Sequence, residues 1–183
     1  MEVIMRKVEV LNYDRQWSTA FEVEAQKLKR VFKDKMIVIF HIGSTSVPGL
    51  KAKPIIDILP VVKDITEVDD YLIEMNALGY EARGENGIRG RRYFQKGHDN
   101  RTHHLHFFAK DSKEIIRHLA FRDYLRTHPL EAGKYGALKE SLAIKHSTDI
   151  HAYIEGKNAY VKKVEQKALA WFERFGNLHQ HRF

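Results

Sequence analysis

The stretch HIGSTSVPGLKAKPIIDI, residues 41–58, decides the fold. It begins at the end of MIVIFHI, residues 36–42, a β-branched and aromatic run that is too short for a helix and predicts a buried strand. Residues 43–53 form a loop rich in Gly, Ser and Pro. The apolar run IIDILPVV, residues 55–62, predicts a second strand, and Pro60 within it favours an edge strand or a bulge.

Outward from this stretch, the spacing of apolar residues predicts the remaining elements. Further strands are expected within residues 2–13 and at residues 80–83, 88–96 and 103–109, with a hairpin turn at residues 97–100. Helices are expected at residues 14–32, 66–78, 111–126, 130–145 and 148–175. The chain thus divides into an α/β part at 1–110 and a helical part at 111–178, with a tail at 179–183. Because no flexible linker separates the two parts, we expect one compact α+β unit.

The amino-acid composition excludes some kinds of site and indicates the kind of partner to expect. The chain has 183 residues, no cysteine, and 31 Lys and Arg against 24 Asp and Glu, a formal net charge of +7. The absence of cysteine excludes disulfides, thiolate metal sites and a cysteine nucleophile. No signal peptide or membrane-spanning run is visible, so we expect a soluble cytoplasmic protein without a membrane partner. The positive charge favours nucleic acid or a phosphorylated small molecule as partner, although lysines and arginines that only solvate helix faces would give the same count.

The loop after the first strand is a candidate phosphate site. Gly43 and Ser44 present backbone amides and a hydroxyl at the head of a turn, an arrangement that accepts phosphate oxygens. The loop lacks the Gly-Lys-Ser/Thr ending of a Walker sequence. An ordinary Gly-Ser turn is the alternative interpretation.

The lone acid of the second strand is a candidate catalytic or metal-binding residue. Asp57 lies within an apolar run, where an ionised carboxylate needs a partner. That partner is either a ligand of the site or a structural arginine such as Arg91 or Arg92. His104 and His106 stand two residues apart, so both imidazoles lie on one face of their strand. With Asp57 they form a candidate site for manganese, magnesium or zinc, and a phosphate-facing or half-exposed pair is the alternative.

Two groups of basic residues are open to two interpretations. Arg89 and Arg91 are expected to share one face of the strand at 88–96, either toward a ligand or as a solvated outer face. The last predicted helix interleaves tyrosines and lysines, which can stack a base and hold phosphates or can form an outer surface covered by lysine stems. These residues are Tyr153, Lys157, Tyr160 and Lys163.

Several motifs together resemble the GrpB family. They are residues 41–58, LGY at 78–80, HHLHFF at 103–108, FRDYLRTHP at 121–129, YGALK at 135–139 and YIEGK at 153–157. The resemblance covers about residues 8–175. It implies a nucleotidyltransferase fold of the DNA polymerase β type, a mixed β-sheet flanked by helices. A GrpB-like domain is fused to dephospho-coenzyme A kinase in some bacteria, which adds a ligand related to coenzyme A to the expectations.

The same resemblance implies roles for individual residues. In that superfamily a Gly-Ser pair binds nucleotide phosphates, and carboxylates on adjacent strands hold divalent metal ions. Gly43 and Ser44 match the pair, and Asp57 matches one aspartate of an Asp-x-Asp strand whose second aspartate is missing here. His104 and His106 stand where the strand with the third carboxylate is expected. One carboxylate and two imidazoles suit a single transition metal better than two magnesium ions.

The leading hypothesis is therefore metal-dependent nucleotidyl or phosphoryl transfer to a small acceptor, with Asp57 as catalytic residue. The candidate phosphate-binding residues are Gly43, Ser44, Lys53 and Arg91, and the candidate metal ligands are Asp57, His104 and His106. The alternative hypothesis is a non-catalytic module that binds a nucleotide or coenzyme A. Nucleic-acid binding ranks last, because the basic residues are dispersed and no DNA- or RNA-reading motif is present.

Overall fold

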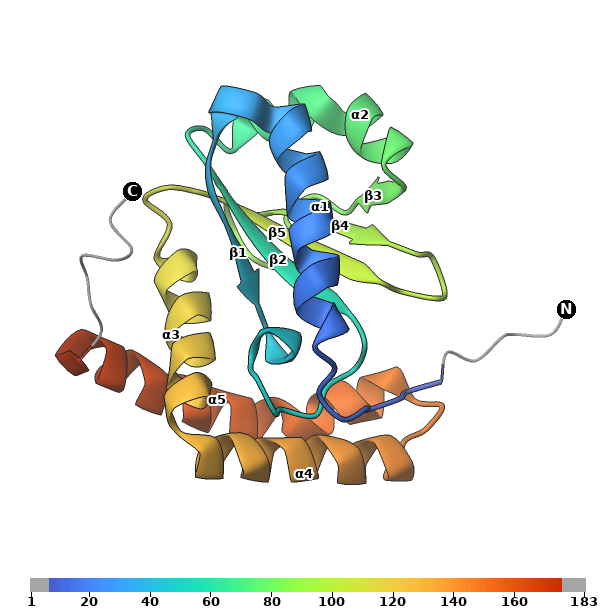
Figure 1. Ribbon diagram of the computed structural model, residues 1–183, viewed down its shortest axis with the longest axis vertical. Helices are drawn as coiled ribbons and strands as arrows, with labels where there is room; N and C mark the ends of the chain where they lie inside the picture. Colours follow the sequence, from blue (N-terminus) through green and yellow to red (C-terminus); the bar gives the residue numbers. More distant parts are fainter. Residues whose placement is uncertain (1–6, 176–183) are drawn as a thin grey trace, which may run out of the picture.

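The computed structural model describes residues 7–175, and its centre is a five-stranded sheet in the order β1-β2-β5-β4-β3 (Figure 1). β2 and β5 run parallel, and the other neighbouring strands are antiparallel. The strands are β1 Met36–Ile42, β2 Ile56–Val62, β3 Tyr80–Ala82, β4 Arg92–Lys96 and β5 His103–Ala109. The helices are α1 Gln16–Phe32, α2 Leu72–Ala77, α3 Lys113–Thr127, α4 Pro129–Lys145 and α5 Ile150–Phe175. The mixed sheet with flanking helices confirms the predicted α+β class.

The helices cover both faces and one end of the sheet. The apolar stripe of α1 packs with inward-facing residues of β2, β4 and β5 in one buried cluster. Ile115 and Leu119 of α3 pack against Ile42, Leu59 and Phe108 on the opposite face. α4 and α5 lie side by side across the end at which β1 leads into the Gly-Ser loop (Figure 1).

Proline within β2 does not place that strand at an edge. β2 lies between β1 and β5, so the edge position expected from Pro60 is wrong. The strand tolerates proline because the pairing with β5 skips Leu59 and Pro60, where a backbone donor is missing, and resumes at Val61. The register shift between β1 and β2 lies in β1, between Met36 and Val38, and not at Pro60.

Two predicted strands are shorter than the sequence suggested. β4 begins at Arg92, because the preceding segment turns with positive φ at Gly87 and Gly90. Arg89 and Arg91 therefore do not share a strand face. Within residues 7–13, Leu11 makes one isolated bridge to Ala52 in place of a strand. The rest of that predicted strand, residues 2–6, and the tail at 179–183 lie outside the described residues.

Local hydrogen bonds account for the helix starts that the sequence predicts. The Asp14 carboxylate accepts from the amide of Gln16 at 2.8 Å, before α1. The Ser112 hydroxyl accepts from the amide of Glu114 at 3.3 Å, as the N-cap of α3. These bonds satisfy amides that the first turn of a helix leaves without a partner.

The C-terminal helices contact both the sheet and the loop after β1. Leu125 of α3 and Tyr135 of α4 share a buried cluster with Val47 and Leu50. The domain boundaries drawn at residues 110 and 178 stay predictions. Over the described residues 7–175, no helix has both the length and the apolar character needed to cross a membrane.

Candidate functional site

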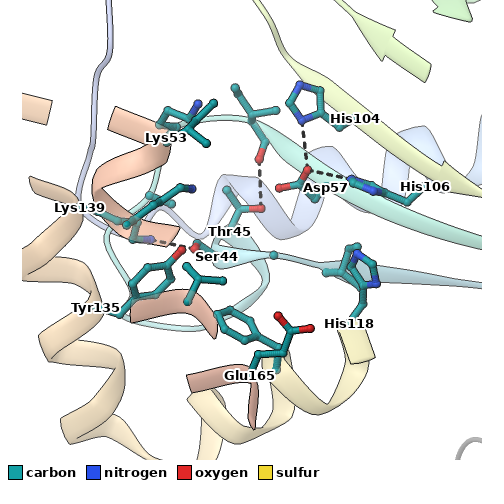
Figure 2. Close-up of a pocket in the computed structure, with 18 of the residues that line it drawn as sticks. Ser44, Thr45, Lys53, Asp57, His104, His106, His118, Tyr135, Lys139 and Glu165 are labelled. Atoms are coloured by element: carbon teal, nitrogen blue, oxygen red, sulfur yellow. Dashed lines mark hydrogen bonds and ion pairs between the residues drawn. The ribbon is translucent and has the colours of Figure 1, made fainter. Parts of the chain in front are cut away.

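A cavity of about 590 Å³ lies where the sheet meets the C-terminal helices. Its walls come from the loop after β1, the start of β2, β4 and β5, and the facing sides of α3, α4 and α5. Figure 2 shows side chains from these elements turned toward a shared space. The volume falls in the range of small-molecule sites, about 300–1,000 Å³.

The bend at Gly43 and Ser44 forms one wall of this cavity. Gly43 has a φ of 70°, a left-handed value that favours glycine, and Ser44–Ser46 form one turn of 3-10 helix. The Gly43 carbonyl accepts from the Ser46 amide at 3.2 Å and from its hydroxyl at 2.6 Å. A Cβ atom at residue 43 would lie 2.6 Å from Oδ2 of Asp57. The close approach of the bend to this carboxylate therefore requires glycine.

His41 supports the bend from within β1. Its Nε2 lies 2.9 Å from the hydroxyl of Thr45, and its ring stacks on Phe21 at 4.8 Å between centroids. Burial lowers the pKa of His41 to about 4. The imidazole is therefore neutral in the folded protein at neutral pH.

This lowered pKa predicts a pH dependence of stability. A histidine in an unfolded chain has a pKa near 6.5. Between about pH 6.5 and pH 4, residue 41 is therefore protonated in the unfolded state but not in the folded state. The free energy of unfolding therefore falls as pH falls through this window, by at most about 1.4 kcal/mol per pH unit for one group. Urea denaturation between about pH 7.5 and pH 4.5 should show a flatter pH dependence in His41→Gln than in wild type.

The matched control for this prediction is His151→Gln, which changes an exposed histidine of α5. It should keep the wild-type slope. An equal slope in His41→Gln and wild type would contradict the assignment of a neutral, buried His41.

Asp57 lies at the centre of the site. The sheet register pairs it with Ile42 on β1 and with His104 on β5. Burial opposes the charge of Asp57, but hydrogen bonds from His104 and His106 outweigh burial and hold the pKa of its carboxyl below the usual range. Asp57 is therefore a fixed negative charge at neutral pH. Its partners are the two histidines and not Arg92, which instead bonds to Asp69 at 2.8 Å.

The three candidate metal ligands form a hydrogen-bonded group (Figure 2). Nδ1 of His104 lies 3.2 Å and Nε2 of His106 lies 3.4 Å from the same atom, Oδ1 of Asp57. A guanidinium nitrogen of Arg91 lies 3.2 Å from Nδ1 of His106. Because a guanidinium only donates, Nδ1 accepts, and the proton of neutral His106 sits on Nε2 and points at Asp57.

This arrangement does not fit a metal ion. With its proton on Nε2, His106 has no lone pair to offer a cation at that atom. Among residues 7–175, no group of three or more His, Asp or Glu side chains is arranged to hold a metal ion. A cation bound to Nε2 of His106 would move the ring proton to Nδ1, and His106 would then lose its contact with Arg91. The metal site and its manganese, magnesium or zinc ion stay a prediction.

Positive charge dominates the walls of the cavity. Of the Lys, Arg, Asp and Glu side chains that line it, five are cations and two are carboxylates. The cations are Lys53, Arg91, Arg117, Lys139 and Lys157, and the carboxylates are Asp57 and Glu165. Because basic side chains outnumber carboxylates on this wall, an anion is the ligand that it would stabilise.

Lys139 is the cation closest to the Gly-Ser bend. It is 2% exposed, and its ammonium donates to the Ser44 hydroxyl at 2.8 Å and lies 4.4 Å from the centre of the Tyr135 ring. Burial, together with the charge of Lys157, lowers the pKa of Lys139 to about 6. Burial also lowers the pKa of Lys157. A bound anion would raise the pKa of both groups, because a nearby negative charge favours their charged forms.

The structure places every candidate site residue on this one cavity. They are Gly43, Ser44, Lys53, Asp57, Arg91, His104 and His106. Lys53 lies 5.3 Å from the ring centre of Tyr153. Arg91 is 5% exposed and donates to the carbonyls of Glu85 and Asn86. The catalytic, phosphate-binding and metal roles assigned to these residues stay predictions.

Sequence reasoning did not single out Arg117, His118 or Glu165, which α3 and α5 bring to the cavity. A sequence signal did exist for other residues of the helical wall. The spacing Tyr-x-x-x-Lys occurs twice, at residues 135–139 and 153–157, and in both cases the ammonium lies over the tyrosine ring. Both pairs line the cavity, and both tyrosines are buried.

The distant structural neighbours share the fold. One is the Cid1 poly(U) polymerase with Mg 3′-dATP bound, which superposes with a TM-score of 0.51 at 14% identity over 75% of this chain and 42% of that chain. At this identity the likeness concerns the fold alone. It supports the nucleotidyltransferase fold that the sequence motifs imply.

Close relatives settle the family. The UPF0157 protein YqkA of Bacillus subtilis is 49% identical over 166 residues, 91% of this chain and 48% of YqkA, so this chain spans about half of that relative. The crystal structure of conserved protein GrpB from Enterococcus faecalis superposes with a TM-score of 0.88 at 48% identity, over 90% of this chain and 99% of that chain. A family model described as GrpB protein matches residues 7–167. The chain belongs to the GrpB family.

Proposed function

We propose that the cavity binds a nucleotide, or another phosphorylated small molecule, through its phosphate groups. The observation that carries this proposal is the excess of cations around the Gly-Ser bend, with buried Lys139 in contact with Ser44. The buried ammonium group of Lys139 donates to the Ser44 hydroxyl, and burial of its charge is unfavourable in an empty site but becomes favourable when phosphate oxygens replace water.

The phosphates belong at the α4 and α5 side of the cavity. The cavity lining there includes Ser44, Lys53, Lys139 and Lys157. The ammonium groups of Lys53 and Lys157 lie 5.3 and 5.2 Å from the ring centre of Tyr153. The tyrosine hydroxyls and the Ser44 hydroxyl add donors of the kind that phosphate oxygens accept. The nucleotide in the Cid1 structure supports this use of the fold, although that ligand is known only for that protein.

Removing the Lys139 charge tests the proposal. In Lys139→Met, calorimetric titration should show the dissociation constant for ATP rising roughly 10- to 100-fold, the loss expected for a charged hydrogen bond in a buried site. The free energy of unfolding should stay equal or rise, because the variant no longer buries an ammonium group. Lys139→Met is therefore expected to bind ATP more weakly than wild type while being at least as stable.

The control is Lys163→Met, which changes an exposed lysine of α5 in the same chemical way. It should bind ATP as wild type does. Wild-type protein that binds none of the nucleoside triphosphates, coenzyme A or inorganic triphosphate would refute phosphate binding in the cavity. Equal ATP affinity in Lys139→Met and wild type would remove Lys139 from the site.

The finer proposal is nucleotidyl or phosphoryl transfer from the bound nucleotide to a small acceptor. Asp57 supports it, because its Oδ1 is held by two imidazoles while Oδ2 lies over the bend at Gly43. With its pKa held low, this carboxylate is suited to orient an acceptor hydroxyl. The acceptor oxygen would bond to phosphorus as the bond to the departing phosphate breaks, and the hydroxyl proton would end on the departing phosphate. The lysines would stabilise the charge of the departing group.

A further inference from the structure

Two arginines of the FRDYLRTHP motif, which are not among the residues that line the cavity, donate to backbone carbonyls of the Gly-Ser loop and of the strand before it. Arg122 of α3 donates to the carbonyl of His41 at 3.1 Å. Arg126, one helical turn later, donates twice to the carbonyl of Ser46, from Nε at 3.0 Å and from Nη2 at 2.7 Å. The two guanidinium groups thus bind the backbone just before and at the end of the segment that carries Gly43 and Ser44.

Asp123 joins the two guanidinium groups. Its Oδ1 lies 2.7 Å from Nε of Arg122 and 3.7 Å from Nη1 of Arg126. Arg122 is 8% exposed, and burial lowers the pKa of Arg126 while leaving it a cation at neutral pH. Two guanidinium charges and one carboxylate leave a net positive charge behind the loop. This charge favours an anion on the cavity side of the same loop.

Attachment of α3 to the sheet does not explain these polar contacts. Ile115 and Leu119 already fix the first half of the helix on the sheet, and Leu125 fixes the second half against Val47 and Leu50. Apolar burial of this kind is the usual means by which a helix is held. The buried guanidinium group of Arg122 is an unfavourable addition unless it stabilises something else.

We propose that Arg122 and Arg126 are positioning residues, which hold the bend at Gly43–Ser46 in the conformation that binds phosphate. This inference rests on the proposed phosphate binding in the cavity. The paired contacts fix both ends of a segment that also needs a positive φ at Gly43, a conformation that a free loop adopts only part of the time. A preformed bend does not lose that conformational entropy when the ligand binds.

Arg126 is the better residue to change, because its side chain is 38% exposed and its loss should leave the core intact. Arg126→Met removes both hydrogen bonds to the Ser46 carbonyl. Arg126→Lys keeps the positive charge but lacks the two adjacent N–H donors of the guanidinium group. We expect the dissociation constant for inorganic triphosphate to rise roughly 10-fold or more in both variants, a loss typical of charged hydrogen bonds. Millimolar ethylguanidinium should restore part of the affinity of Arg126→Met, and it should leave wild type unchanged.

A second measurement needs no ligand. Amide hydrogen exchange of residues 43–46 in the empty protein should speed up in Arg126→Met, while the amides of β5 keep their wild-type protection. The control is Arg92→Met, which removes a guanidinium that binds Asp69 away from the cavity. It should change neither triphosphate affinity nor exchange in the bend.

The two proposals fail in different ways. Wild-type protein that does not bind triphosphate refutes the phosphate site, and the exchange measurement then still decides whether Arg126 holds the bend. Unchanged exchange at residues 43–46 in Arg126→Met overturns the positioning role. Wild-type affinity in both Arg126 variants also overturns it.

Discussion

Gly43→Ala is expected to abolish phosphate binding in the cavity, with the dissociation constant for ATP rising roughly 100-fold or more. The added Cβ would lie 2.6 Å from Oδ2 and 3.1 Å from Cβ of Asp57, inside van der Waals distance of both. The bend must then move away from the sheet, or Asp57 must leave its hydrogen bonds with His104 and His106. Movement of the bend would separate the Ser44 hydroxyl from Lys139, and movement of Asp57 would remove the fixed carboxylate beside the bend, so either change disturbs the phosphate site.

Alanine also strains the backbone at this position. Gly43 has a φ of 70°, where a non-glycine residue costs about 1–2 kcal/mol. Gly49 provides a matched control in the same loop, because it has a φ of 79° and an added Cβ would meet nothing within 4 Å. Gly49→Ala should lose only the stability due to backbone strain in urea denaturation, less than Gly43→Ala loses, and it should keep its affinity for ATP. If calorimetry gave both variants the same affinity, the close approach to Asp57 would not matter for binding.

The sequence predicts best those features that depend on neighbouring residues. Four of the five predicted helices, and the acceptors near the starts of α1 and α3, follow from local pattern and are confirmed, whereas the helix predicted at residues 66–78 begins as a 3-10 helix at Thr66–Tyr71 before α2. The residue types that meet at Asp57, His104 and His106 are also visible in the sequence. A lone carboxylate in one apolar strand and two imidazoles two residues apart in another can meet on one sheet face.

Features that depend on packing between distant elements were not predictable. Pro60 indicates an edge strand in isolation, but the parallel pairing of β2 with β5 skips it, and this pairing depends on the whole sheet. Arg117 and Glu165 reach the cavity only because α3 and α5 pack together. A lysine such as Lys139 at helical spacing suits both a solvated face and a buried site, and only the position of α4 over the bend decides between them.

The hydrogen-bond network around Asp57 could not be predicted from the sequence either. The residue types suggest a ligand set for a transition metal, because two imidazoles and a carboxylate often serve that purpose. The structure adds Arg91, whose donation to Nδ1 of His106 directs the remaining proton of that ring toward Asp57. No spacing rule predicts this contact, since Arg91 lies in a turn and not on the strand face expected for it.

Asp57→Asn is expected to lower the rate of group transfer without weakening nucleotide binding. The substitution removes a negative charge from a cavity lined by five cations, so the affinity for ATP should stay equal or increase. Transfer should fall roughly 100-fold or more, because asparagine does not offer the fixed negative charge that orients an acceptor hydroxyl. Transfer is measured from labelled nucleoside triphosphates to a panel of small acceptors. Each reaction is run with manganese, magnesium or zinc, and once with a chelator. ATP binding is measured in parallel by calorimetry.

The control for this prediction is Asp69→Asn, which removes a half-exposed carboxylate that binds Arg92 outside the cavity. It should leave both transfer and binding at wild-type levels. Undiminished transfer in Asp57→Asn would refute the catalytic role of Asp57, because any reaction would then proceed without its charge. Nucleotide binding by wild type without transfer under any of these ions would instead identify a binding module. In that case the hydrogen bonds of Asp57 with His104 and His106 would serve to hold the bend at Gly43 in place, and Asp57→Asn would lower stability without any effect on chemistry.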